Sequence, residues 1–329
     1  MQERPESVPG EPHAAAPVAV TVRVAVVIPC WNEAVAIAGV VAAFRAVLPA
    51  ADIYVYDNNS SDGTTDVARQ AGAIARREVL QGKGHVVRRA FADVDADIFV
   101  LVDGDGTYDA STAPAMVDKL RRERLDMVTG TRVSEASAAY RPGHRLGNAV
   151  LSGLVQRIFG DRVTDMLSGY RVFSRRFVKT FPALSAGFDT ETEFTVHALA
   201  LDMPVGELPT PYRERPPGSA SKLRTYSDGA RILVRIIQLV KEERPLPFFS
   251  LCGLVLALAA LVLGTPVVLE FLRTGLVPRF PTAILATGLM LLSFLSVAAA
   301  LILDAVARGR KEMKRLAYLQ HRPVPAGDE

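Results

Sequence analysis

The sequence predicts an α/β protein in which a doubly wound, Rossmann-like sheet is followed by two membrane-spanning helices. Short apolar runs, typical of strands buried on both faces, alternate with helical segments between residues 22 and 129. Polar clusters follow three of these runs, where a sheet of this class binds its ligands. Near the C-terminus, two stretches of 22 residues each carry no charge. They account for most of the positive mean hydropathy of the 329-residue chain, which is unusual for a soluble enzyme.

The elements of the α/β region, which extends over residues 22–223, are justified in order by their patterns. The first strand reads VAVVI and the third reads IFVLV, both continuous apolar runs. The helices carry apolar residues at helical spacing. The predicted strands cover residues 24–28, 53–56, 98–102 and 127–129. The predicted helices cover residues 34–48, 83–94 and 113–123.

The two uncharged stretches cover residues 248–269 and 282–303. Each is long enough to cross about 30 Å of hydrocarbon at the helical rise per residue. Two buried core helices are a poorer explanation, because uncharged runs of this length rarely occur together in a soluble fold. Basic residues flank this hairpin (247–305), so the positive-inside rule predicts an inner-membrane protein with its α/β domain and both termini in the cytoplasm. Residues 306–329 are predicted to be a basic cytoplasmic tail.

Residues 224–246, just before the hairpin, are predicted to be an amphipathic interfacial segment. Arg231, Arg235 and Gln238 fall on one helical face, and apolar residues surround the other. Residues 146–159 show a similar pattern. A surface helix that packs on the core fits either pattern equally well, but adjacency to the spans favours the membrane surface for the first.

Composition and charge exclude several function classes. With 38 Lys+Arg against 35 Asp+Glu, the net charge of +3 is too small to indicate nucleic-acid binding. Cys30 and Cys252 provide neither a disulfide scaffold nor a zinc-binding spacing. Residues 1–21 are rich in Pro, Glu and Ala, lack the pattern of a signal peptide and are predicted to be a disordered tail.

Two carboxylates, Asp103 and Asp105, follow an apolar strand and are separated by a single glycine. Hard oxygen ligands of this kind suit Mg²⁺ or Mn²⁺, which can bridge a diphosphate. An isolated Asp-x-Asp is more often an acidic turn, but the position at the end of a buried strand favours a metal site.

The other two polar clusters are Asn32 with Glu33, and the stretch from Asp57 to Asp62. Such groups can hydrogen-bond a base and a ribose at the switch point of a sheet. Taken singly, the first cluster also fits a helix N-cap with an acidic first turn, and the second fits turn chemistry. Three clusters at one sheet edge favour a ligand site.

Five motifs occur in order: Pro29-Cys-Trp-Asn-Glu33, Asp57-Asn-Asn-Ser-Ser-Asp-Gly63, Gly82-Lys-Gly84, Asp103-Gly-Asp105 and Gly130-Thr-Arg132. This order resembles glycosyltransferase family 2. Three later segments resemble the branch of the family that makes polyprenyl-phosphate sugars, the dolichol-phosphate mannosyltransferase type. They are DMLSGYRVFSRR from Asp165, GFDTETEF from Gly187 and RPPGSASKL from Arg215. The resemblance covers about residues 24–223, and the hairpin is similar to that of membrane-anchored bacterial members.

The resemblance implies a GT-A fold that binds a UDP- or GDP-linked sugar, with Pro29, Glu33 and Asp57 at the base and ribose. From the same clusters, Asn32, Asn59 and Asp62 are predicted to bind substrate as well. Asp103 and Asp105 would hold Mg²⁺ or Mn²⁺ on the donor diphosphate.

By the same resemblance, Arg132 and Arg215 would contact the diphosphate or the acceptor phosphate, where a bidentate guanidinium fits. Lys83 and Lys222 would add phosphate-directed charge. The mannosyltransferase type commonly has Gln where this chain has Thr107, so the metal surroundings and the donor need not be the same.

The implied reaction is an inverting single displacement, in which a lipid phosphate oxygen attacks the anomeric carbon of the sugar. A phosphate monoester with a second pKa of about 6 is already nucleophilic at neutral pH, which makes a general base optional. In the segment where relatives with hydroxyl acceptors keep a base, Glu191 is the predicted candidate, and its other role would be to orient nearby basic residues. Arg141 and Arg145 are predicted to meet the acceptor headgroup, although a solvated basic turn fits them nearly as well.

The sequence disfavours three alternatives, of which the first has the same catalytic domain. A processive polysaccharide synthase needs a Gln-x-x-Arg-Trp motif, and the only tryptophan here is Trp31. A non-catalytic scaffold that binds nucleotide sugars is disfavoured because both aspartates of the Asp-x-Asp motif are present. A dinucleotide dehydrogenase would need GxGxxG after the first strand, and no such motif follows it here. Another lipid or glycan acceptor, and a homo-oligomer, both stay open.

Overall fold

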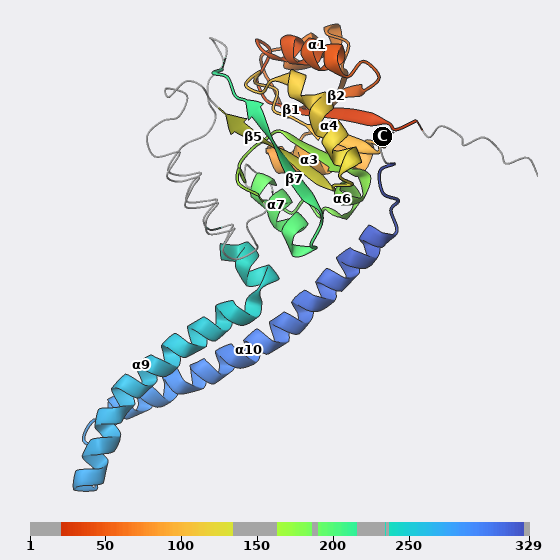
Figure 1. The fold of residues 1–329 in the computed structure, drawn as a ribbon. Helices are drawn as coiled ribbons and strands as arrows, with labels where there is room; N and C mark the ends of the chain where they lie inside the picture. Colours follow the sequence, from red (N-terminus) through yellow and green to blue (C-terminus); the bar gives the residue numbers. More distant parts are fainter. Residues whose placement is uncertain (1–20, 134–162, 186–189, 216–233, 235–236, 326–329) are drawn as a thin grey trace, which may run out of the picture.

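The computed structural model describes residues 21–133, 163–185, 190–215, 234 and 237–325 (Figure 1). Three predicted substrate-binding residues, Arg141, Arg145 and Lys222, therefore lie outside the described residues. The same holds for the helix predicted at 146–159 and for most of the predicted interfacial segment.

The described residues form a seven-stranded mixed sheet with the order β3-β2-β1-β4-β6-β5-β7. Neighbouring strands run parallel, except that β6 is antiparallel to both β4 and β5. Their bounds are β1 Val24–Cys30, β2 Asp52–Asp57, β3 Ile74–Arg77, β4 Ile98–Leu101, β5 Met127–Val133, β6 Arg171–Ser174 and β7 Val205–Pro211. The four predicted strands are all present, whereas β3, β6 and β7 lack the long apolar runs that would have predicted them.

Helices cover both faces of the sheet, because successive residues of each strand point to opposite sides. Val26 and Ile28 of β1 pack into one core with α1, α2 and α4, while Ala25 and Val27 pack into a second core with α3, α6 and α7. The bounds are α1 Ile37–Val47, α2 Thr64–Gln70, α3 Lys83–Asp93, the short 3₁₀ helix η1 Ala110–Thr112, α4 Ala113–Arg122, α6 Arg175–Thr180 and α7 Thr190–Ala200.

Two long helices, α9 (Pro245–Thr274) and α10 (Phe280–Leu319), form a hairpin that extends away from the sheet domain (Figure 1). In the described part of the chain, these two are long and apolar enough to cross a membrane, and only 11% of each apolar window is buried. Helices of a soluble core would bury far more of their apolar side chains, so the low burial favours membrane association. The helices approach closely at Gly253, whose carbonyl accepts a 2.8 Å hydrogen bond from Ser293 Oγ.

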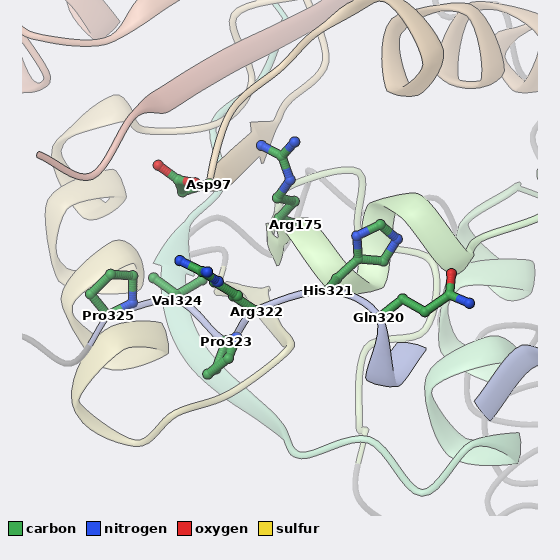
Figure 2. A pocket seen from close by; sticks show the side chains of 8 residues that line it. All are labelled: Asp97, Arg175, Gln320, His321, Arg322, Pro323, Val324 and Pro325. Atoms are coloured by element: carbon green, nitrogen blue, oxygen red, sulfur yellow. The ribbon is translucent and has the colours of Figure 1, made fainter. Parts of the chain in front are cut away.

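The first part of the C-terminal basic region, residues 306–319, is a helical continuation of the second span. α10 remains helical to Leu319, and Tyr318 near its end donates a 2.7 Å hydrogen bond to Asp126 at the start of β5. The chain then passes the amino-end edge of the sheet, where residues 320–325 line a pocket of about 370 Å³ with Asp97 and Arg175 (Figure 2). The last span is therefore attached directly to the sheet domain.

Candidate active site

The candidate site lies at the carboxyl ends of β1, β2 and β4, where the three polar clusters meet. Backbone N–H groups of the first loop bind side chains of the second: Asn32 N–H donates to Ser60 Oγ at 2.8 Å and Glu33 N–H to Thr64 Oγ1 at 2.9 Å. Asn32 also adopts a left-handed backbone conformation, with φ of 53°. This conformation, which Asn tolerates better than most residues, turns the chain sharply after β1. The predicted convergence of the first two clusters is present.

Two predicted substrate-binding residues of the second cluster hold the loops together. Asp62 accepts hydrogen bonds from Ala34 N–H at 3.0 Å and from Thr64 N–H at 3.1 Å. Asn59 donates through Nδ2 to the carbonyl of Val79 at 2.9 Å. Both side chains thus have a structural role that the sequence pattern did not reveal.

Pro29 and Asp57, which are predicted to lie at the base and ribose, occupy neighbouring strands. Pro29 in β1 is paired in register with Tyr56 of β2, one residue before Asp57. Asp57 is only 3% exposed, and its carboxylate accepts from Ser60 N–H at 3.3 Å through both oxygens. Because a carboxylate offers about four lone pairs, it retains acceptor capacity for a ligand hydroxyl.

Asp103 and Asp105 follow β4 in a tight turn packed against β1. Gly104 between them has no room for a side chain, since a Cβ would collide with Cys30 Sγ. Asp105 Oδ1 accepts hydrogen bonds from Thr107 N–H at 3.1 Å and from Thr107 Oγ1 at 2.7 Å. Thr107, the position that departs from the mannosyltransferase pattern, therefore fixes the orientation of the Asp105 carboxylate.

Lys83, the first residue of α3, joins two carboxylates that are distant in the sequence. Its buried Nζ forms ion pairs with Asp103 and with Glu191 at the start of α7. Burial lowers the pKa of Lys83, but the two carboxylates outweigh burial and raise this pKa above its ordinary value. Burial raises the pKa of Glu191 above its ordinary value; the positive charge of Lys83 opposes this shift, and the like charge of Asp103 adds to it. Glu191 Oε2 has no hydrogen-bond partner among the described residues.

Arg215 approaches the site from the segment after β7. Its Nη2 lies 2.7 Å from Asp105 Oδ2, and its Nη1 lies 3.7 Å from Glu33 Oε1. Both carboxylates are almost completely buried. The first and third clusters are thus bridged by one guanidinium.

Arg132 in β5 forms a two-pronged ion pair with Asp165, with both nitrogen–oxygen distances at 2.8 Å. Burial opposes the charged form of Asp165, but the hydrogen bonds and charge of Arg132 prevail and hold the pKa of Asp165 below its ordinary value. The Arg132 guanidinium also lies over the ring of Tyr212, 5.7 Å from the ring centroid. Tyr212 packs on Tyr108, whose hydroxyl accepts from Gly169 N–H at 2.9 Å. These rings link Arg132 to the loop that carries Asp103 and Asp105.

Arg171, inside the DMLSGYRVF segment, is a fully buried cation that the sequence analysis did not single out. It donates to the carbonyls of Met166 and Ser168 at 2.6 and 3.1 Å, and to Thr195 Oγ1 in α7 at 2.9 Å. Burial lowers the pKa of Arg171 to about 10. This side chain fixes the loop that holds Asp165 to the helix that carries Glu191. The signal for Arg171 in the sequence was its position inside a segment that resembles the polyprenyl-phosphate branch of the family.

The donor atoms present fit a divalent cation that is shared with a substrate. Across the described ranges, no group of three or more His, Cys, Asp or Glu side chains is arranged to hold a metal ion. Asp103 and Asp105 supply two carboxylates, and Mg²⁺ typically binds one or two carboxylates together with substrate phosphates and water. The site therefore fits a metal–diphosphate complex better than a resident metal with a full protein shell.

Comparisons with known proteins concern the family and the fold. The family model described as glycosyl transferase family 2 matches residues 25–181. An uncharacterised protein of Shigella flexneri is 53% identical over 157 residues, which cover 48% of this chain and 96% of that protein. Glycosyltransferase AglJ of Haloferax volcanii is 32% identical over 306 residues, 90% of this chain and 98% of that protein. The dolichyl-phosphate hexose transferase of the same organism is 28% identical over 220 residues, 67% of this chain and 95% of that protein.

Among solved structures, glucosyl-3-phosphoglycerate synthase from Mycobacterium tuberculosis, bound to Mn²⁺, UDP and glucosyl-3-phosphoglycerate, has a TM-score of 0.55. The two sequences are 21% identical, and the match covers 66% of this chain and 80% of the synthase chain. At this identity the likeness concerns the fold alone, and it confirms the predicted GT-A architecture.

Proposed function

The chain belongs to glycosyl transferase family 2, and we propose that it transfers a monosaccharide from a nucleoside-diphosphate sugar to a polyprenyl phosphate. The transfer inverts the anomeric centre and takes place at the cytoplasmic face of the inner membrane. The observation that carries the proposal is the combination, in one chain, of two paired aspartates at the sheet edge and an apolar hairpin fixed to that sheet. A relative named dolichyl-phosphate hexose transferase supports the acceptor class.

The sugar donor binds along the edge formed by the ends of β1, β2 and β4. Asp57 and Glu33, buried carboxylates at the ends of β2 and β1, would accept hydrogen bonds from the base and ribose. Asp103 and Asp105 would hold Mg²⁺ or Mn²⁺, which, when bound, neutralises charge on the donor diphosphate. Arg215 lies next to Asp105, where its guanidinium can meet the leaving group.

In the chemical step, an oxygen of the lipid phosphate forms a bond to the anomeric carbon. The bond between that carbon and the nucleoside diphosphate breaks, and the diphosphate leaves with the electron pair. Because the attacking phosphate dianion carries no proton, a general base is not required. Glu191 is held by Lys83 beside Asp103, so its proposed task is to orient cations around the reacting phosphates.

The acceptor reaches the site from the membrane that anchors the chain. Lys311 and Arg315 of α10 lie on the same end of the hairpin as the sheet domain, 3.2 and 3.7 Å from Asp202. Basic residues at this end favour the cytoplasmic side, where anionic lipids attract them. The catalytic domain would therefore face cytoplasmic pools of UDP- or GDP-linked sugars.

A donor panel tests the proposal. Full-length protein in lipid nanodiscs that contain polyprenyl phosphate is incubated with UDP- and GDP-sugars and Mn²⁺ or Mg²⁺, and lipid products are identified by mass. We expect one donor to yield a lipid-phosphate hexose, with transfer reduced at least about a hundredfold in Asp103→Asn. Product on a different lipid or glycan, or none with any donor, would contradict the proposed acceptor. Analytical ultracentrifugation of the same preparation gives the oligomeric state.

A further inference from the structure

Each of the two proposed metal ligands is engaged by a basic side chain of the protein itself. Asp103 forms an ion pair with Lys83, whose side chain is only 8% exposed. Asp105 forms an ion pair with Arg215 through a 2.7 Å contact. Any cation that binds these carboxylates competes with an ammonium on one side and a guanidinium on the other.

Both basic residues have a second acidic partner that is not a proposed metal ligand. Lys83 also pairs with Glu191, and Arg215 lies 3.7 Å from Glu33. If Lys83 or Arg215 separates from its aspartate, it therefore keeps one acidic partner. A buried charge without any partner would be costly. The arrangement thus provides a low-cost alternative position for each cation.

We propose that Lys83 and Arg215 are exchangeable counter-ions, which a divalent metal displaces from Asp103 and Asp105 and which the donor diphosphate then binds. The inference rests on the proposed function, because it takes the two aspartates as the metal site. Its consequence is that metal and nucleotide bind cooperatively. Metal alone must weaken two existing ion pairs, whereas a diphosphate provides new anionic partners for the two displaced cations.

This coupling is a free energy between two ligands and is therefore reciprocal. In the intact protein, a nucleoside diphosphate should strengthen Mn²⁺ binding by more than the extra phosphate ligands alone provide. If one counter-ion is neutralised, metal alone should bind more tightly. The additional strengthening by the nucleotide should then shrink, because one displaced charge is missing.

The test measures Mn²⁺ binding to full-length protein in nanodiscs without acceptor, with and without UDP, from the electron paramagnetic resonance signal of free Mn²⁺. Values with UDP are corrected for Mn²⁺ bound to UDP in buffer. Lys83→Met and Arg215→Met remove one charge each, while Lys83→Arg retains it. The control is Arg213→Gln, because Arg213 is close to the site through its N–H bond to Thr107 but pairs with Asp109 at the surface.

We expect Lys83→Met and Arg215→Met to bind Mn²⁺ alone about tenfold more tightly than the wild type, within the usual range of coupling between sites. Their enhancement by UDP should fall by a similar factor, and Lys83→Arg and Arg213→Gln should stay near the wild type. Thermal unfolding verifies that each variant is folded. If Lys83→Met does not fold, Arg215→Met alone tests the proposal.

The Mn²⁺ measurements distinguish a wrong metal site from a wrong counter-ion exchange. If Asp103→Asn binds Mn²⁺ as well as the wild type, the proposed metal site is wrong. If Asp103→Asn loses Mn²⁺ but the two methionine variants bind it no more tightly than Arg213→Gln, the metal site stands and the exchange is overturned.

Discussion

Replacing Tyr318 with phenylalanine is expected to loosen the attachment of α10 to the catalytic domain. Asp126, which is fully buried, accepts from Ser174 Oγ and Arg176 Nε at 2.6 Å through Oδ1, and from the Tyr318 hydroxyl at 2.7 Å through Oδ2. The Arg176 guanidinium lies over the Tyr318 ring, 4.6 Å from its centroid. Tyr318→Phe keeps the ring and this cation–π contact and removes only the hydroxyl.

The magnitude follows from the charge and burial of the acceptor. A hydrogen bond to a charged group contributes about 1.5–3 kcal/mol, and Asp126 Oδ2 would lose this donor inside the protein. At 1.4 kcal/mol per factor of ten, local detachment of the helix end should become about 10- to 150-fold more frequent. Tyr318→Ala should detach more often still, because it also removes the ring from Arg176.

Hydrogen exchange of the α10 backbone amides, read by mass spectrometry on nanodisc samples, measures this opening directly. Exchange of residues 311–319 should accelerate in Tyr318→Phe, while the amides of β1 and β4 stay protected. Met313→Ala is the control, because Met313 is 65% exposed on the same helix. Equal protection of these amides in Tyr318→Phe, Met313→Ala and the wild type would refute the reasoning.

Three further outcomes are expected at the site. Thr107→Val removes a hydroxyl donor from the second aspartate of the Asp-x-Asp motif, and metal-dependent transfer should fall about tenfold at subsaturating Mn²⁺; unchanged transfer would show that the hydroxyl does not orient the carboxylate. Gly169→Ala places a Cβ against the Asp103 carboxylate, so Mn²⁺ titrations should reveal weaker binding in a variant that still folds. Because the pKa of Asp165 is held below its ordinary value, its pair with Arg132 stabilises the fold above about pH 4 and loses this contribution as the pH falls further. Denaturant unfolding of Asp165→Asn should accordingly depend less steeply on pH between about 5 and 3, and a slope equal to that of the wild type would contradict the assignment.

The elements that the sequence predicted are those whose signal is local. The run at 98–102 marks β4 because a strand buried on both faces needs apolar residues throughout. The spans at 248–269 and 282–303 lie inside α9 and α10 because an uncharged segment of that length has one favourable environment. By contrast, β3 carries two adjacent arginines and β7 two prolines, so neither presents a strand pattern.

The clusters at the strand ends were also predictable, because parallel strands bring their carboxyl ends to one sheet edge. The hydrogen-bond partners of those residues were not predictable. Asp62 and Asn59 occupy the predicted edge, but they form hydrogen bonds to the backbone of neighbouring loops. A polar residue in a turn looks the same in the sequence whether its partner is a ligand or a backbone amide.

The sequence by itself determined the family, the sheet-and-helix alternation, the aspartate pair and the apolar hairpin, because periodicity and short motifs record local geometry. Only the tertiary structure decided which charges meet. Lys83 joins Glu191 across 108 residues, and Tyr318 joins Asp126 across 192. Such pairs leave no local pattern, since either partner alone is an ordinary polar residue, and packing of the whole chain selects them. The counter-ions at the aspartates and the attachment of the membrane helix are therefore properties of the fold.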